Sequence, residues 1–397
     1  MSLKTKIKIL CFVAALLLSL SSCIPKPQFG DAVESESTSQ VFNPATDDGG
    51  SSDIGKKYGA VAELVESGEK LTVAVDTDFE YEVVADGVKI TKYTGAYKSE
   101  SADDYIILII PETIAGKSVV SIGKEAFAIV AHLDAIVIPN SVTVIENLAF
   151  YGCSYLTYVK FGDRAKQIGD YSFAMCPSLY NVDISSADKI GIGAFIGCDS
   201  LNTITLPFVG GGSEDNSYLG YIFGASSVEF NKEFVPGSLR KIILNDKVTN
   251  IPDLAFYKCQ YITSVVIPDS VLSIGVRAFY KCRSIVEIDT GSGVKTIADD
   301  AFFGCDNLKS IKLGSALESL GMQAFFGCAD LESVNIPANL TEIKASTFYG
   351  CTSLKGIDLA NVKAIGKDAF GGCEDLIPPD ILRVENIAEG NDNLYKH

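Results

Sequence analysis

Nine cysteines recur at nearly constant spacing, and their thiols are the groups of this chain best suited to covalent or metal chemistry. They are Cys153, Cys176, Cys198, Cys259, Cys282, Cys305, Cys328, Cys351 and Cys373. Disulfides are common in exported chains, but pairing neighbours in this series would leave one thiol over and twist the stack of repeats. Zinc sites need converging ligands such as Cys-x-x-Cys, which does not occur. We therefore expect reduced, buried thiols that bond to turn carbonyls, and neither a metal nor a cofactor.

Residues for acid–base or nucleophilic catalysis are scarce. The only histidines are His132 and His397, and neither Gly-x-Ser-x-Gly nor His-Glu-x-x-His occurs. Residues 76–80, Asp-Thr-Asp-Phe-Glu, resemble a calcium loop, but Tyr81 stands where that loop needs glycine and Gly87 where it needs a bidentate glutamate. The sequence therefore predicts no catalytic residues, and an enzyme is only a distant alternative.

The cysteines belong to a repeat with a period of about 23 residues, and the elements of this repeat must hold them in place. Leu or Ile follows three positions after each cysteine, and Ile-Gly-x-x-Ala-Phe comes later in the unit, as at 274–279 and 365–370. The phenylalanines of the repeat are Phe127, Phe150, Phe173, Phe195, Phe256, Phe279, Phe302, Phe325, Phe348 and Phe370. One unit cannot bury its apolar side, whereas units stacked about 4.8 Å apart align these residues into one core. The sequence predicts a mostly β solenoid of about 11 coils over 119–377.

This repeat resembles a known family. Its pattern, Cys-x-x-Leu-x-x-Ile-x-Leu-Pro-x-x-Leu-x-x-Ile-x-x-x-Ala-Phe, is similar to the BspA-like, or Treponema pallidum-type, leucine-rich repeats over roughly residues 118–377. Val130 and Pro236 replace the cysteine in two units, and Thr290 replaces a core aliphatic residue. The resemblance implies a right-handed leucine-rich-repeat solenoid. It also implies a bacterial surface protein, since most members of the family act in adhesion or bind host matrix proteins.

The N-terminal residues predict export and a lipid anchor. Three lysines precede an apolar run, 9–18, which Leu-Ser-Ser-Cys closes at 20–23. This order is typical of a secretory signal peptide, here 1–22. The closing residues resemble a bacterial lipobox, which implies cleavage before Cys23 and attachment there of diacylglycerol and an acyl chain such as palmitate. Cleavage that leaves Cys23 unmodified is the alternative. Because Ile24 is not the Asp that marks inner-membrane retention in enteric bacteria, the outer-membrane surface is favoured for a cell with two membranes.

Composition divides the rest of the chain. Residues 23–57 are rich in Ser, Glu, Asp, Thr and Gly and are predicted to be a disordered tether. Residues 58–118 are predicted to form an N-terminal β cap that contains a hairpin at Asp86-Gly87. A Pro-Pro pair ends the repeat, so 378–397 is expected to be a C-terminal cap or tail.

The charge excludes one class of partner. The chain has 33 Lys and Arg against 50 Asp and Glu, a net charge of −17. Removing the signal peptide with its three lysines would leave 30 basic against 50 acidic residues, or −20. Since nucleic-acid affinity comes from cations that displace counterions, no nucleic-acid partner is expected. No later apolar stretch approaches the roughly 20 residues of a membrane span, so membrane contact is expected through the lipid anchor only.

An interruption of the repeat is the first candidate for ligand binding. The segment between Cys198 and Cys259 is longer than two units, and the extra residues fall at 207–218 and 224–235. Insertions in solenoids form loops on one face. The candidate binding residues there are Ser213, Glu214, Asp215 and Asn216. A neutral insertion is the alternative.

The second candidate is a row of aromatic residues. The residue after the repeat phenylalanine is aromatic in five consecutive coils: Tyr257, Tyr280, Phe303, Phe326 and Tyr349. If these rings point outward, they form an exposed strip that is typical of a contact surface. A turn that tucks both rings of each pair into the core is the arrangement we favour.

Together these features predict a cell-surface lipoprotein whose solenoid binds a protein or a glycan, in adhesion to host cells or matrix. The outward positions of the first strand of each coil, such as Tyr158, Lys160 and Asp183, are polar and mixed in charge. Such positions suit protein or glycan contact and carry no catalytic signature. A passive structural protein of the envelope is the alternative.

Overall fold

The computed structural model describes residues 53–68, 71–95, 105–212, 216–377 and 384–395. The predicted signal peptide, most of the tether and Cys23 lie outside the described residues. Contacts divide the chain after Asp48, and the unit from Gly49 onward holds every element described below. In the described residues, no helix is long and apolar enough to span a bilayer.

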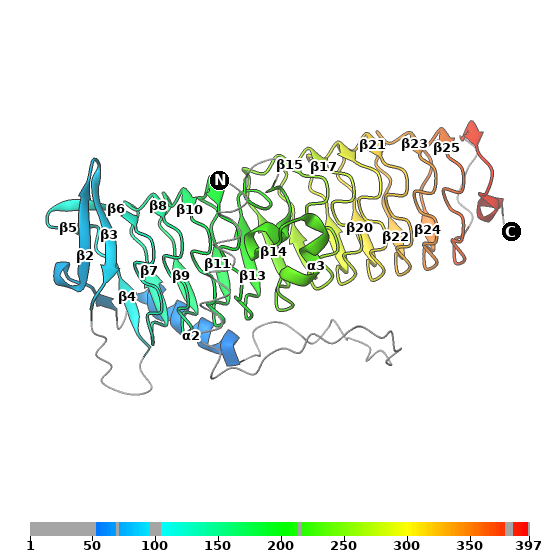
Figure 1. Ribbon diagram of the computed structural model, residues 1–397. Helices are drawn as coiled ribbons and strands as arrows, with labels where there is room; N and C mark the ends of the chain where they lie inside the picture. The colour runs from blue at the N-terminus through cyan, green and yellow to red at the C-terminus, as the bar shows by residue number, and fades with distance from the viewer. Residues whose placement is uncertain (1–52, 69–70, 96–104, 213–215, 378–383, 396–397) are drawn as a thin grey trace. The chain divides into compact units, whose positions relative to one another are not determined.

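The predicted solenoid is confirmed. The chain forms about 11 turns at a spacing near 23 residues, mostly β and with little helix (Figure 1). Each regular coil contributes two short strands, and equivalent strands of successive coils pair in parallel. Two ladders of strands result, which we call the first-strand ladder and the second-strand ladder.

The first-strand ladder consists of two hydrogen-bonded sheets, which divide between Val266 and Glu287. Its strands are β4 (Ile107–Ile109), β7 (Ala135–Val137), β9 (Tyr158–Lys160), β11 (Asn181–Asp183), β13 (Thr203–Leu206), β14 (Lys241–Leu244), β16 (Ser264–Val266), β18 (Glu287–Asp289), β20 (Ser310–Lys312), β22 (Ser333–Val334) and β24 (Gly356–Ile357). Because β13 pairs directly with β14, the insertion between these two strands leaves the ladder continuous.

The second-strand ladder is interrupted by the insertion and again between Leu320 and Glu342. Its strands are β6 (Lys117–Ile122), β8 (Val144–Ile145), β10 (Gln167–Ile168) and β12 (Lys189–Ile190), then β15 (Asn250–Ile251), β17 (Ser273–Ile274), β19 (Thr296–Ile297), β21 (Ser319–Leu320), β23 (Glu342–Ile343), β25 (Ala364–Ile365) and β26 (Asn386–Ile387). The inserted residues form short helices between the two halves: η3 (Leu219–Phe223), η4 (Val228–Phe230) and α3 (Asn231–Phe234).

The repeat phenylalanines stack through the core. Within each half of the solenoid, successive ring centroids lie 4.9–5.7 Å apart and the ring planes are within 20° of each other. Every one of these rings is fully buried. Thr290 is buried in an aliphatic position, and its hydroxyl donates to Lys312 O (3.3 Å) and accepts from Gly314 N (3.0 Å). A polar side chain is tolerated in this core because both hydrogen bonds are made.

The cysteines form a second buried row, as predicted. All nine are free and buried. In eight of them the thiol donates to the carbonyl of the phenylalanine one coil back, at 3.0–3.3 Å. Cys259, which follows the insertion, instead lies 4.0 Å from Tyr257 O. Burial raises the pKa of eight of these thiols, from Cys176 to Cys373, and raises that of Cys373 to about 12, which makes them poor nucleophiles.

The N-terminal cap contains the expected hairpin. Strands β2 (Phe79–Val84) and β3 (Gly87–Tyr93) pair antiparallel, and β3 continues the second-strand ladder by pairing with β6. A Cβ at Gly87 would collide with the carbonyl of Ser118, so the glycine is needed for close approach of two strands. The remaining elements of the cap are β1 (Thr72–Val73), η1 (Asp76–Asp78) and β5 (Thr113–Ile114).

The cap also contains a helix that the sequence analysis does not predict. Helix α2 (Asp53–Ser67) crosses the predicted boundary between residues 57 and 58, and it packs on β7 and β9. It begins in the predicted tether and continues into the predicted β cap. The helix buries Val61 and Val65 against the first-strand ladder, and this contact orders residues that composition alone assigns to a tether.

The C-terminal coil is closed by a short cap. Strand β26 pairs with β25, and η5 (Asp392–Tyr395) follows. The Asn391 side chain accepts a hydrogen bond from Phe370 N (3.0 Å) and donates to Gly366 O (2.9 Å). Residues 384–395 thus satisfy backbone groups of the last coil, as a cap does.

Candidate binding surface

Five aromatic side chains stack on the outside of the coils, and we call this stack the aromatic strip. Its members are Tyr257, Tyr280, Phe303, Phe326 and Tyr349. Successive ring centroids lie 4.7–5.1 Å apart and the ring planes are within 18° of each other. Four of the side chains are half-buried and Tyr349 is 39% exposed; none belongs to the buried core. The favoured arrangement, in which a turn tucks both rings into the core, is therefore wrong, and the rings point outward.

Hydrogen bonds between coils explain this direction. Phe256 N donates to Ala278 O (2.7 Å) and Lys258 N donates to Tyr280 O (2.8 Å), whereas Tyr257 N bonds within its own coil. The segment is a series of turns, with Tyr257 N bonded to Leu254 O, in which alternate residues bond to the next coil. The phenylalanine of each pair lies inside and its aromatic neighbour lies outside.

The stacking decides which part of each ring a ligand can reach. Because the coils repeat at about 5 Å, the rings of Tyr280, Phe303 and Phe326 each have a neighbouring ring of the strip on both faces. The edges of these rings point to solvent. Ring edges carry partial positive charge and ring faces partial negative charge. The strip therefore offers edges to carbonyl oxygens, to aromatic faces and to aliphatic side chains.

Cations lie beside the rings at the N-terminal end of the strip. Lys258 Nζ is 4.8 Å from the centroid of the Tyr257 ring. The Arg277 guanidinium and Lys281 Nζ lie 5.8 Å and 5.3 Å from the centroid of the Tyr280 ring. Since Tyr257 and Phe303 stack on the two faces of the Tyr280 ring, only Lys258, beside the end ring Tyr257, is placed for cation–π attraction. A hydrogen bond with Tyr257 raises the pKa of Lys258, so this end of the strip keeps its positive charge.

The second insertion is fixed to the first ring of the strip. The Asn231 side chain is buried; it accepts from Gly220 N (2.8 Å) and donates to Tyr257 O (3.1 Å). Glu229 pairs with Lys258 at 3.6 Å. Residues 228–234 are therefore held against the coil that begins the strip.

This insertion adds exposed aromatic surface. Phe230 is 46% exposed and Phe234 is 38% exposed, with ring centroids 6.4 Å apart. At the other end, a Cβ at Gly371 would lie 2.7 Å from the Tyr349 ring, so the glycine that follows in the next coil ends the strip. The candidate surface therefore extends from α3 to Tyr349.

The first insertion has different neighbours. Ser213, Glu214 and Asp215 lie outside the described residues. Asn216 is half-buried, and its carbonyl accepts from Gly211 N (2.8 Å), while Gly211 O accepts from Ile190 N (3.4 Å). The described part of this insertion thus lies beside β12, to which one hydrogen bond joins it. Of the two candidate insertions, the structure joins 224–235 to the strip.

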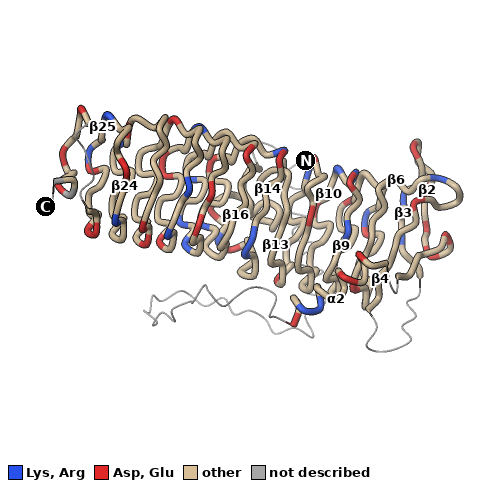
Figure 2. Tube along the Cα trace, turned by 180° about the vertical axis from the view of Figure 1, so that it is seen from behind, with Lys and Arg blue, Asp and Glu red and all other residues tan. Residues whose placement is uncertain are grey.

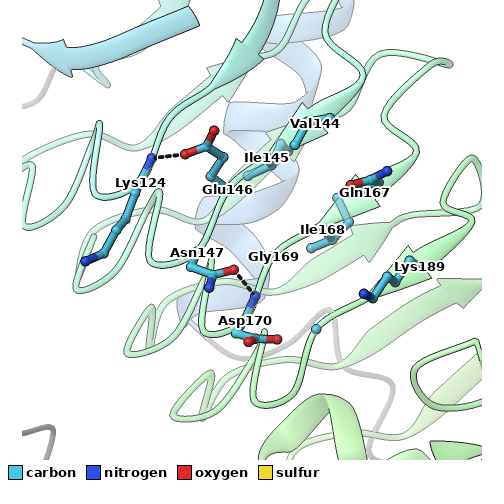
Figure 3. A pocket seen from close by; sticks show the side chains of 11 residues that line it. Lys124, Val144, Ile145, Glu146, Asn147, Gln167, Ile168, Gly169, Asp170 and Lys189 are labelled. Atoms are coloured by element: carbon cyan, nitrogen blue, oxygen red, sulfur yellow. Dashed lines mark hydrogen bonds between the residues drawn. The ribbon is translucent and has the colours of Figure 1, made fainter. Parts of the chain in front are cut away.

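A polar groove of about 460 Å³, which the sequence analysis does not predict, lies along β8, β10 and β12 (Figure 3). Glu146 Oε2 accepts from Lys124 N (2.9 Å), and Asn147 Oδ1 accepts from Asp170 N (2.9 Å). The same bond from a side chain to the next coil recurs at Asp253 and at other repeat positions. Because these side chains satisfy turn N–H groups, the groove is explained by the packing of successive coils.

The calcium-like segment is also explained by local structure. Asp76 accepts from Ala115 N (2.9 Å) and Asp78 accepts from Val75 N (2.8 Å), so both carboxylates bond to the backbone around η1. In the described ranges, no three His, Cys, Asp or Glu side chains come together as metal ligands.

Basic and acidic residues are interspersed along the coils (Figure 2). Several pair across neighbouring coils, such as Lys312 with Asp289 (2.7 Å) and Lys355 with Glu332 (3.2 Å). The acidic balance of the chain is therefore spread over the surface of the coils.

Comparison with known proteins agrees with this architecture. The family model of the BspA type leucine rich repeat region matches six copies, over residues 110–215 and 231–355. A leucine rich cell surface protein of Faecalibacterium prausnitzii is 25% identical, covering 79% of this chain and 93% of its own, with a TM-score of 0.37. A leucine-rich repeat protein of Bacteroides ovatus is 24% identical, covering 78% and 86%, with a TM-score of 0.43.

The leucine-rich repeat protein of T. pallidum is 21% identical, covering 78% of this chain and 92% of its own, with a TM-score of 0.24. No curated protein matches the chain. The family match spans more than half of the chain and coincides with the observed coils. This chain therefore belongs to the family with the BspA type leucine rich repeat region.

Proposed function

We propose that this chain is a lipid-anchored surface protein of a bacterial envelope that binds a protein ligand through the aromatic strip and the neighbouring helix α3. The observation that carries the proposal is the outward stack of five rings between α3 and Gly371. Rigid aromatic side chains are the usual anchors of protein interfaces. A contiguous row of partly exposed aromatic side chains is typical of a contact site.

The geometry favours a protein over a glycan. Sugars bind aromatic residues by laying their C–H groups on an open ring face, and in the strip the inner faces are covered by neighbouring rings. The exposed edges, with Lys258, Arg277 and Lys281 beside them, suit backbone carbonyls, carboxylates and apolar side chains of a protein. Adhesion to host cells or matrix is the role that such a surface would serve on an anchored protein.

Binding of the purified mature chain to an extract of host matrix proteins tests this proposal. A variant with Tyr257, Tyr280 and Tyr349 changed to Ser should lose at least tenfold in affinity, because three of the five ring edges are removed. Tyr81→Ser is the matched control, since Tyr81 is as exposed as Tyr349, at 39%, but lies in the N-terminal hairpin. Equal binding by both variants would disprove a role of the strip. Absence of saturable binding by the unmodified chain would favour the passive envelope protein.

A further inference from the structure

The outward face of the first-strand ladder changes character along the solenoid. Over the first coils it is apolar, with Ile107 and Ala135 fully buried and Val137 and Tyr158 packed beside them. In later coils the same positions hold polar or charged side chains, as in β18, β20 and β22. We call the apolar part, formed by β4, β7 and β9, the N-terminal strand face.

Helix α2 covers this face. Val61 and Val65, four residues apart on one side of the helix, are buried against it. The Tyr58 ring lies 5.6 Å from the ring of Tyr158 and 5.4 Å from that of Tyr180. Tyr158, which the sequence analysis places among the free outward positions, is therefore half-buried under a helix. Burial and a hydrogen bond to Glu66 raise its pKa.

Ion pairs hold the helix at both ends. Near its start, Lys57 Nζ lies 2.6 Å from Asp134 Oδ1. Near its end, Glu66 accepts from Lys160 Nζ (3.0 Å) and from the Tyr158 hydroxyl (3.1 Å). The face thus selects a helix with a cation in its first half, two apolar side chains four apart and a carboxylate in its last turn.

The same charges oppose helix formation by α2 alone. A helix dipole favours acids in the first turn and bases in the last turn. Asp53 in the first turn meets this preference, but Lys56 and Lys57 follow it closely and Glu66 stands near the end of the helix, whose last turn has no base. Two glycines and three β-branched residues further lower the helix propensity of the 15 residues. Isolated helices of this length are marginal even with better sequences. Helix α2 is therefore held in its fold by the face it covers.

We propose that the N-terminal strand face is an exchangeable helix-binding site, with α2 as its resident occupant. When α2 dissociates, a helix of a partner protein binds to the face in its place. This helix has the same features in the same order: a Lys, two apolar residues four apart, and a Glu. The charge complementarity of Asp134 and Lys160 sets the direction in which this partner helix lies. This site is separate from the aromatic strip and does not depend on the function proposed for it.

A labelled synthetic peptide with the sequence of residues 53–67 is the probe, and fluorescence anisotropy measures its binding to the full chain. In one variant of the chain, Val61 and Val65 are both changed to Asp, which removes the apolar contacts of α2 and leaves the face unchanged. The vacated chain should bind the peptide saturably and at least tenfold more tightly than the unmodified chain. A peptide with the same two valine-to-aspartate changes is the matched control and should not bind.

Absence of saturable binding by the vacated chain would overturn the proposal, as would equal binding of both peptides. Hydrogen exchange of the unmodified chain provides a second measurement that needs no variant. The amides of α2 should exchange through a local opening, at least a hundredfold faster than the core amides of β7 and β9. If the amides of α2 exchange only together with those of β7 and β9, the helix unfolds only with the solenoid. That result would also overturn the proposal.

Discussion

Phe302→Ala and Phe303→Ala together test which ring of each aromatic pair lies in the core. The aromatic strip exists only if Phe302 is the core residue and Phe303 the surface residue. The two residues are adjacent, chemically identical, and each stacked between two rings. Phe302 lies 5.0 Å from Phe279 and 5.3 Å from Phe325, and it is fully buried. Phe303 has equally close partners, at 4.9 Å and 4.7 Å, but is half-buried. Burial is therefore the property that differs between them.

The expected losses follow from that difference. Truncation of a buried phenylalanine costs about 3–5 kcal/mol, because transfer energy is lost and a cavity remains. At Phe303 solvent fills the vacated space, so no cavity remains and the loss comes from two stacked pairs worth roughly 0.5–1.5 kcal/mol each, or about 1–3 kcal/mol in total. The carbonyl of Phe302 that accepts from Cys328 is retained in the variant, so the thiol row does not contribute to the difference.

Urea unfolding followed by circular dichroism measures both losses. The slope of the free energy against urea should stay the same in both variants, since the surface exposed on unfolding hardly changes. Each coil contacts only its neighbours, so the destabilisation should be greatest in the coils that flank the change. Equal losses at the two positions, or a larger loss at Phe303, would refute the assignment of inner and outer rings.

Four further outcomes are expected. The ladder thiols of the folded chain should not react with a thiol reagent at pH 8, whereas about nine should react in denaturant; coil-to-coil disulfides found by mass spectrometry would contradict this. Cys23→Ser should move the chain from the membrane fraction to the soluble fraction, and unchanged fractionation without acyl mass on Cys23 would contradict the anchor. Thr290→Val, although closer to the repeat pattern, should cost about 1–3 kcal/mol in urea unfolding, because it leaves a buried N–H unpaired. A hydrogen bond with Lys160 holds the pKa of Glu66 below 4.5, so the Glu66 contribution to the stability of α2 is present above pH 4.5 and is lost as pH falls through the lowered pKa. The hydrogen-exchange protection of α2 should fall over that range, and Glu66→Gln should remove this dependence.

The core could be predicted because each position of the repeat occupies the same position in every coil. Nine cysteines and ten phenylalanines recur in this way, so the burial of each residue type is predicted from nine or ten units rather than from one. The same counting predicts the two strands of each coil. Even Thr290 is placed correctly in this way, although the sequence carries no sign of the two hydrogen bonds that satisfy its hydroxyl.

The direction of the strip is mispredicted because it depends on a backbone angle. The residue after each strip aromatic has positive φ, as in Lys258 (58°) and Lys281 (55°), and lysine does not reveal such a conformation. In the next three coils the same position is glycine: Gly304, Gly327 and Gly350. Taken over the five coils together, the glycines indicate a left-handed residue directly after the ring. That signal is in the sequence, and it favours a tight turn after an outward aromatic residue.

The repeat pattern does not predict helix α2, because the period specifies the strands and the core of a coil and not what packs on its outer surface. Its own signal is brief: Tyr58, Val61 and Val65 are spaced three and four residues apart, as on one side of a helix. Glycines and charges placed against the dipole mask this signal, and the charges stand there because they fit Asp134 and Lys160. The charges of Lys57 and Glu66 thus make α2 hard to predict as a helix and also make it complementary to the N-terminal strand face. Because α2 is stable only on this face, its charged residues are those that pair with the face, as the residues of a bound peptide ligand would be.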